Sequence, residues 1–201
     1  GRSAGWLPAA AVASHKTAAD PPHLLLLPER SFDRAAFLAA VQQRQKEHGY
    51  VSIVCGEGIT NADGSPVSAS ETRDKFDNVE FGAMGGTSAA MMLHKMIADE
   101  FGWRGEFQVT ESLQMCAADR GSAIDFEEAY QVGREAVGRA IGGNSGQMVT
   151  IERTSNDPYQ IEFGSAPLKD VANHERPMPD EFISADGMGV TQAVHDYVRP
   201  L

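Results

Sequence analysis

The sequence lacks the long apolar runs and the excess of basic residues that mark two large classes of protein. No stretch approaches the roughly 20 consecutive apolar residues of a membrane-spanning helix. Lys and Arg number 17 against 28 Asp and Glu, which gives a formal net charge of −11. An acidic surface disfavours general binding to nucleic acid or to an anionic membrane, because both attract basic residues. A few arginines that converge in one cleft are still enough to bind a small phosphorylated ligand.

Cysteine is scarce, and the targeting signals are weak. Cys55 and Cys116 lie far apart without CxxC spacing, which predicts two reduced thiols rather than a disulfide. No pair of His or Cys residues has the spacing of zinc ligands, so we do not expect a structural metal. The stretch 1–14 superficially suggests a signal peptide, but an early Arg and a Trp-Leu-Pro interruption favour a helix start and a cytoplasmic protein. Because the chain does not begin with Met, we expect a fragment or a processed product.

A self-contained catalytic motif is also absent from the sequence. We find no Ser-His-Asp arrangement, no Walker loop and no GxGxxG. The functional prediction therefore depends on residues suited to binding.

Predicted strands and helices alternate through most of the chain. The run HLLLL at 23–27, bounded by prolines, predicts a strand buried on both faces, and YVSIVC at 50–55 predicts a second strand. Between them we expect a helix over 34–47, capped within 31–33 and closed by Gly49. This alternation predicts an α/β fold, a Rossmann-like three-layer domain with a mainly parallel sheet.

The rest of the chain gives further elements with clear boundaries. We expect helices over 6–16, 88–100 and 126–140, the last capped by Asp125, and a polar surface loop over 61–74. A third strand is predicted over 103–109, and a hairpin is predicted from strands 148–153 and 159–163 with its turn at 155–158. The domain prediction is an α/β body over 1–167 and a helical tail over 168–201 that packs on it.

Four places carry side chains suited to a phosphorylated polyol. Gly1 and Arg2 open a helix, where backbone amides favour an anion, although a frayed terminus is the alternative. Glu57 follows a buried strand between two glycines and offers acceptors to sugar hydroxyls, unless it is a solvated turn residue. Arg104 and Arg120 are candidates for a phosphate, with an ordinary surface or ion-paired arginine as the alternative.

Several segments resemble the phosphofructokinase family, and specifically its pyrophosphate-dependent branch. The start GRSAGWLPAAA resembles the family's Met-Gly-Arg helix start, and VSIVCGEG resembles its next sugar-contacting segment. DKFDNVEFGAMGGTSAAMML resembles the Phe-Gly and Leu-Gly-Gly region, and the stretch 124–153 resembles an Asp-x-x-Glu-Ala helix with its following strand. The tail over 168–201 resembles the C-terminus of the pyrophosphate-dependent branch. The resemblance covers nearly the whole chain.

The resemblance implies a part of a glycolytic phosphotransferase. The family moves a phosphoryl group reversibly between pyrophosphate and fructose 6-phosphate with Mg²⁺, giving fructose 1,6-bisphosphate, and a homo-oligomer is expected. Carried over by position, Gly1 and Arg2 belong to the sugar site, Glu57 binds sugar hydroxyls, and Arg104 reaches the 6-phosphate of a neighbouring subunit's ligand.

Two departures from the family pattern limit what the chain is expected to do alone. The family often has His or Tyr, then Arg three residues later, where this chain has Ser112 and Met115, so one phosphate-binding Arg is absent. Either Arg120 substitutes for it, or the site prefers a sugar phosphate related to fructose 6-phosphate. The family's Gly-Gly-Asp donor loop and its Thr-Ile-Asp segment with the catalytic base belong to the half preceding Gly1, and that half also binds most of the Mg²⁺. Three hypotheses stay open: an enzyme half that is inactive alone, a non-catalytic sugar-phosphate-binding or regulatory module, and a structural subunit that supports a separate catalytic chain.

Overall fold

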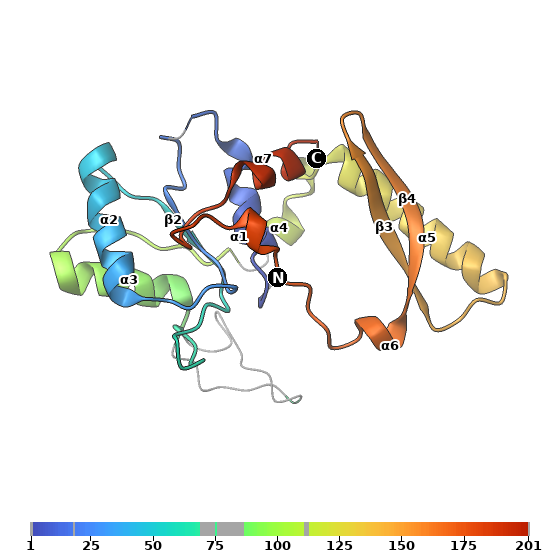
Figure 1. Cartoon of the computed structure of the whole chain (residues 1–201), viewed down its shortest axis with the longest axis horizontal. Helices are drawn as coiled ribbons and strands as arrows, with labels where there is room; N and C mark the ends of the chain where they lie inside the picture. The colour runs from blue at the N-terminus through green and yellow to red at the C-terminus, as the bar shows by residue number, and fades with distance from the viewer. Residues whose placement is uncertain (1, 18, 69–74, 76–86, 111–112, 201) are drawn as a thin grey trace. The chain divides into compact units, whose positions relative to one another are not determined.

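The computed structural model describes residues 2–17, 19–68, 75, 87–110 and 113–200. The chain forms two compact units (Figure 1). The first unit consists of Gly1–Glu111 with Arg176–His195, and the second consists of Ser112–Glu175 with Asp196–Leu201. No helix in the described part of the chain is long and apolar enough to cross a membrane. The division into a body over 1–167 and a tail over 168–201 stays a prediction.

The first unit is built on the parallel pair of strands that the sequence predicts. β1 (Leu24–Leu26) is buried along its whole length and pairs in parallel with β2 (Ile53–Cys55), with Leu25 opposite Val54. Between them runs α2 (Arg34–His48). The Asp33 side chain caps this helix by accepting from the Ala36 N–H at 3.0 Å, and Gly49 ends it in the left-handed conformation, φ 78°. The parallel pair with its helices confirms the predicted α/β class.

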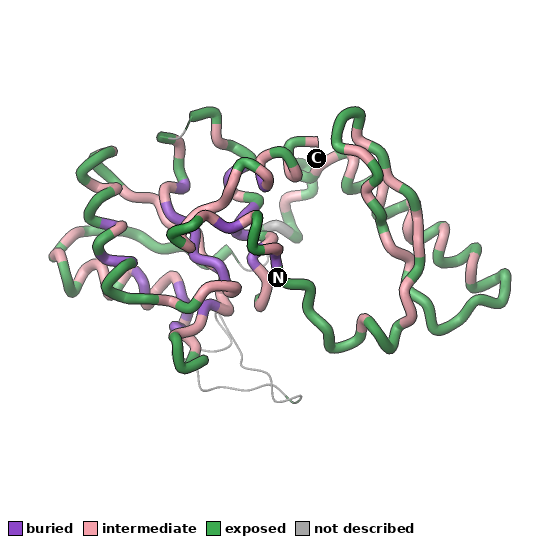
Figure 2. The backbone as a smooth tube through the Cα atoms, viewed as in Figure 1, coloured by how far each residue is buried: buried purple, intermediate pink, exposed green. Residues whose placement is uncertain are grey.

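A hydrophobic cluster joins β1 to the helices of the first unit. Leu24 and Leu26 of β1 pack with Phe37 and Val41 of α2, with Ile59, and with Leu93 of α3 (Ala89–Phe101), all of them buried. Figure 2 shows that the buried positions gather in the first unit. Helix α3 confirms the predicted helix over 88–100. It begins after Ser88, whose Oγ accepts from the Met91 N–H at 3.1 Å, and it ends at Gly102, φ 65°.

The prediction of a third strand over 103–109 is wrong. The chain after α3 forms no strand in this segment, and residues 104–110 are exposed. The segment contacts the helix that precedes it, since Trp103 stacks on Phe101 with ring centroids 4.3 Å apart and the Gly105 carbonyl lies 3.0 Å from His94 Nε2. A strand here would need a neighbouring strand to pair with, and none pairs with this segment in the described structure.

The N-terminal helix is shorter than predicted. Helix α1 (Trp6–Ala10) tightens into a 3₁₀ turn, η1 (Ala11–Ser14), and ends there instead of continuing to Lys16. The Asp20 carboxylate accepts from the backbone N–H groups of Lys16 and Thr17 at 2.6 and 2.8 Å. Those N–H groups are thereby satisfied outside a helix, and these bonds lower the pKa of Asp20. The predicted loop over 61–74 lies outside the described residues beyond position 68, and its first part forms a turn in which Asn61 N–H bonds the Ser65 carbonyl.

The second unit is a long helix with a hairpin. After α4 (Leu113–Cys116) and η2 (Ala118–Arg120), α5 runs from Ala123 to Ile141. Its cap is Ser122, whose Oγ accepts from the N–H groups of Ile124 and Asp125, so the prediction of Asp125 as the cap was wrong by three residues. Asp125 lies in the first turn instead.

The predicted hairpin is confirmed, with longer strands. β3 (Gln147–Asn156) pairs antiparallel with β4 (Tyr159–Pro167), and a bulge lies between Arg153 and Ser155. The turn is shorter than the predicted 155–158 and consists of Asp157 and Pro158, because Asn156 pairs directly with Tyr159.

The remainder of the chain consists of short elements. They are α6 (Leu168–Val171), η3 (Asp180–Phe182) and α7 (Gln192–Val198). Within the first unit, the Leu25 N–H bonds the Met188 carbonyl at 2.9 Å, and Trp6 packs edge-on against Phe182. The C-terminal segment 176–195 is thus part of the first unit's structure.

Candidate functional site

Glu57 lies just beyond the carboxyl end of β2. Its Oε1 accepts a hydrogen bond of 3.0 Å from the backbone N–H of Ala89, the first residue of α3. The N-terminus of a helix carries unsatisfied N–H groups and a partial positive charge, so a carboxylate is stabilised there. Glu57 is therefore held in place by α3 and is not a freely solvated turn residue. Burial raises the pKa of the neighbouring Cys55 thiol to about 12, and the charge of Glu57 adds to this effect.

The glycines on either side of Glu57 are required by close contacts with neighbouring segments. A Cβ at Gly56 would lie 2.8 Å from the Pro28 ring, and one at Gly58 would lie 2.2 Å from the carbonyl oxygen of Arg2. The Gly58 N–H donates to that same oxygen at 3.1 Å. The structure therefore brings the Arg2 backbone against the Gly-Glu-Gly turn.

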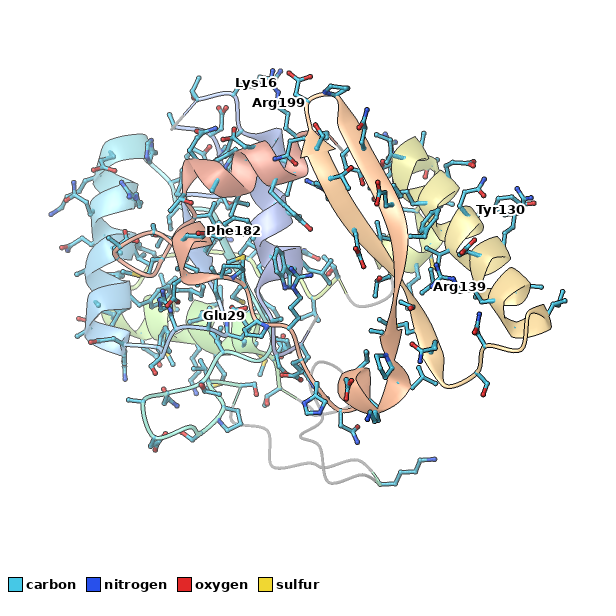
Figure 3. The ribbon with its side chains drawn as sticks, turned by 45° about the vertical axis from the view of Figure 1, so that its right-hand side comes forward. Lys16, Glu29, Tyr130, Arg139, Phe182 and Arg199 are labelled. Atoms are coloured by element: carbon cyan, nitrogen blue, oxygen red, sulfur yellow. The ribbon has the colours of Figure 1, made fainter. Side chains whose placement is uncertain are left out.

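Glu29 anchors the segment that carries Arg2, and sequence reasoning missed it. Its Oε1 accepts from the N–H of Gly5 and from the N–H of Met178, each at 2.8 Å (Figure 3). Its Oε2 is buried and has no hydrogen-bond partner among the described residues. One carboxylate thus joins the start of α1 to the C-terminal segment. The only sequence signal was its place directly after a buried strand and Pro28.

Within the first unit, Arg104 does not lie beside Glu57, and the remaining predicted site residues belong to the second unit or are not described. Arg104 is exposed beyond the C-terminal end of α3, whereas Glu57 contacts the N-terminal end. Arg120 is exposed and paired with Asp119 at 3.2 Å, and Met115 is 77 % exposed on α4, both in the second unit. Gly1 and Ser112 lie outside the described residues.

In the described ranges, no group of three or more His, Cys, Asp or Glu side chains is arranged to hold a metal ion. Cys55 and Cys116 are both free thiols.

Comparisons with known proteins find relatives of the chain. No protein-family model matches the chain. The pyrophosphate--fructose 6-phosphate 1-phosphotransferase of Methylococcus capsulatus is 40% identical over all of this chain, and that of Halomonas elongata is 39% identical over the same length. A crystal structure of a pyrophosphate-dependent phosphofructokinase from Marinobacter aquaeolei matches the whole chain with a TM-score of 0.81 and 34% identity. Over its whole length this chain matches the C-terminal half of pyrophosphate-dependent phosphofructokinases.

The chain matches only part of these phosphofructokinases. It spans 47% of the length of each of the two curated relatives and 45% of the Marinobacter chain, and the matched part is their C-terminal half. The likeness to the Marinobacter structure confirms the Rossmann-like α/β fold class.

Proposed function

We propose that this chain is the sugar-phosphate-binding half of a phosphofructokinase that transfers a phosphoryl group from pyrophosphate to fructose 6-phosphate. The observation that carries the proposal is the joining of the Arg2 segment to the Gly56-Glu57-Gly58 turn at the carboxyl end of the parallel strands. Ligands of such folds bind at that edge. In this role Gly1 and Arg2 contact the sugar phosphate, and Glu57 accepts hydrogen bonds from hydroxyl groups.

The mechanism of such an enzyme requires positioning and charge neutralisation around the moving phosphoryl group. In the proposal this chain positions the acceptor, and Glu57 is kept rigid for that task by its bond to Ala89. The donor loop, the catalytic base and most of the Mg²⁺ coordination are supplied by the complementary half. The described residues of this chain do not present a metal-binding group of their own, and no step of the chemistry is assigned to them.

The second unit supports the need for a complementary half. None of its described residues is buried, so it has no hydrophobic core of its own (Figure 2). A unit of this size without a core is not expected to be stable in isolation. We propose that the complementary half covers it.

One face of α5 is the surface best suited to that contact. Four large apolar side chains, 54 to 83 % exposed, form what we call the α5 stripe: Phe126, Tyr130, Val137 and Ile141. At about 100° per residue they fall within roughly 60° of arc along about 22 Å of helix. Two residues on the opposite face hold the hairpin. Arg139, labelled in Figure 3, donates to the carbonyls of Gly164 and Phe163 at 2.7 and 3.0 Å. Glu128 accepts from the Tyr159 hydroxyl. The stripe therefore points away from the hairpin and is left for a partner.

Arg104 fits a role between subunits. It is exposed beyond the end of α3 that lies away from Glu57, which suits a side chain that reaches the 6-phosphate of a neighbouring subunit's ligand. We therefore propose a homo-oligomeric enzyme. From the sequence we also propose a cytoplasmic location. Arg120 is the proposed substitute for the arginine that Met115 replaces, although its pairing with Asp119 must then be exchanged for the phosphate.

The second candidate function is a sugar-phosphate-binding or regulatory module without catalysis. The observation that favours it is Met115, which is exposed and uncharged where the family often has a phosphate-binding Arg.

The two candidates are separated by measuring binding and turnover on the purified chain and on its fusion to a complementary half. For the enzyme half we expect fructose 6-phosphate to bind to the chain, no turnover by the chain alone, and turnover in the fusion. Binding without turnover in a folded fusion that also binds pyrophosphate supports the module. Failure of the chain to bind any sugar phosphate contradicts both functions.

A further inference from the structure

Four of the chain's six histidines line one cleft of the first unit, away from the residues proposed for the sugar site. The cleft has a volume of about 250 Å³. His15 follows η1, His23 precedes β1, His48 is the last residue of α2, and His195 lies in α7. Arg44 of α2 is a fifth nitrogen-bearing side chain in the lining. The lining residues, all in the described part of the chain, include no carboxylate.

His23 carries a buried hydrogen-bond donor in the wall of this cleft. Its Nδ1 accepts from the backbone N–H of Ser52 at 3.0 Å, so in the neutral ring the proton must lie on Nε2. The Nε2 atom is buried and has no hydrogen-bond partner among the described residues. The nearby Ala19 carbonyl favours the protonated ring, but it is not in hydrogen-bonding geometry with Nε2. A buried donor without an acceptor is unfavourable, so this position calls for an acceptor.

The ring of His23 is fixed in its orientation. It stacks on His48 with centroids 4.4 Å apart and planes 4° apart, and Tyr50 packs edge-on at 4.9 Å. Burial lowers the pKa of His23 and the proximity of His48 lowers it further, so the ring is neutral at pH 7. A bound anion opposes both effects.

His15 adds a second unsatisfied nitrogen. Its Nε2 is also buried without a hydrogen-bond partner in the described structure, and its ring lies 5.8 Å from that of His195. The neighbouring carboxylates are engaged at the margin of the cleft. Glu47 bonds Arg44 at 2.8 Å and lies 3.7 Å from His48, whereas Asp20 bonds the backbone of Lys16 and Thr17. Asp186 bonds Ser184 and Met188.

We propose that the histidine cleft is a binding site for a small phosphate-bearing anion, separate from the sugar site. Imidazole rings and an arginine in a lining without carboxylates are the chemistry that recognises a phosphate group. The cleft is far larger than the roughly 15 Å³ that one water needs, so it has room for a phosphate and a small attached group. A metal ion is disfavoured because Arg44 repels it and because the described His, Cys, Asp and Glu side chains form no metal-binding group.

The test is a titration of the chain with inorganic phosphate, followed by NMR of histidine ring nitrogens labelled with ¹⁵N. Chloride at the same ionic strength is the control for general salt effects, and Zn²⁺ is titrated separately. Arg44→Gln removes the cationic partner from the cleft. Arg34→Gln is its matched control, because it makes the same change at an exposed position of the same helix.

We expect the His23 signal to shift saturably with phosphate and the pKa of His23 to rise. Arg44→Gln should weaken phosphate binding about tenfold, the size expected for losing one charge-assisted contact, and Arg34→Gln should not. Shifts that chloride reproduces, an unchanged affinity in Arg44→Gln, or ring signals that respond to Zn²⁺ and not to phosphate would each overturn the proposal. If Arg44→Gln does not fold, His195→Gln against His174→Gln makes the same comparison.

The outcome is independent of the proposed function. Phosphate bound beside Arg2 and Glu57 would leave the His23 signal in place and would be insensitive to Arg44→Gln. A failure here therefore leaves the phosphofructokinase proposal intact, and the reverse also holds.

Discussion

Replacing Glu57 separates its structural role from its proposed role in sugar binding. Glu57→Gln keeps an oxygen that accepts from the Ala89 N–H but removes the charge, whereas Glu57→Ala removes both. Ser88→Ala is the matched structural control, because it deletes the neighbouring cap of the same helix, the bond from the Met91 N–H to the Ser88 Oγ.

The bond geometry sets the expected magnitudes. A hydrogen bond to a charged group contributes about 1.5–3 kcal/mol, so Glu57→Ala should lower the free energy of unfolding by about that amount. Glu57→Gln loses mainly the interaction of the charge with the helix N-terminus, about 0.3–1 kcal/mol. Ser88→Ala should cost about 1 kcal/mol, which is typical of a lost N-cap. These values are measured by urea unfolding of the chain.

Kinetics of the complete enzyme then test the sugar role. We expect both Glu57 variants to lower kcat/KM for fructose 6-phosphate roughly ten- to hundredfold, at about 1.4 kcal/mol per decade. The KM for pyrophosphate should change little, and Ser88→Ala should leave the sugar kinetics unchanged despite its loss of stability. Unchanged sugar kinetics in a folded Glu57→Ala enzyme would remove Glu57 from the site. An equal loss in Ser88→Ala would show that Glu57 acts only through the position of α3.

Cysteine labelling, glycine substitution and a change on α5 test other parts of the structure. At pH 8 iodoacetamide should modify the exposed Cys116 and spare Cys55, whose pKa is about 12, as mass spectrometry of the peptides would show. Equal labelling of the two cysteines would contradict the burial of Cys55. Because folding raises the Cys55 pKa from 9.0, the stability that this thiol contributes is present below pH 9.0 and is lost as the pH rises towards 12. Gly58→Ala should destabilise the chain by about 1–3 kcal/mol and weaken sugar binding, because the new Cβ meets the Arg2 carbonyl at 2.2 Å. Gly138→Ala has open space around the new Cβ and should stabilise the chain by about 0.5–1 kcal/mol. Thermal unfolding of both variants measures this difference. Ile141 is 83 % exposed, so Ile141→Glu should leave the stability of the isolated chain nearly unchanged. The variant should fail to associate with the complementary half in analytical ultracentrifugation. Undiminished association would contradict the α5 stripe as the contact.

The sequence predicted the elements of the first unit well where strong local signals agree. Prolines bound β1, Asp33 caps α2, and Gly49 adopts the positive φ that ends it, so each boundary has a local cause. The error at α5 arose because Ser122 and Asp125 are both good N-cap residues. The helix begins after Ser122, and Asp125 lies in its first turn.

What could not be predicted depends on contacts between distant segments. The residues 103–109 favour a strand locally, but they do not specify a neighbouring strand for it to pair with. Glu29 joins Gly5 to Met178 through two backbone N–H groups, and no spacing in the sequence records such a bond. The contact between Arg2 and Gly58 could not be predicted either, because its only signal in the sequence is the glycine at position 58.

The central claim is that this chain positions the sugar phosphate for a phosphoryl transfer that it cannot perform alone. The most direct measurement is fructose 1,6-bisphosphate formation from pyrophosphate, fructose 6-phosphate and Mg²⁺, by the purified chain and by the same chain fused behind the N-terminal half of the Methylococcus relative. We expect no product from the chain alone and Mg²⁺-dependent product from the fusion. Product formed by the chain alone, free of host enzyme, would contradict the claim, as would a folded fusion that binds pyrophosphate and forms none.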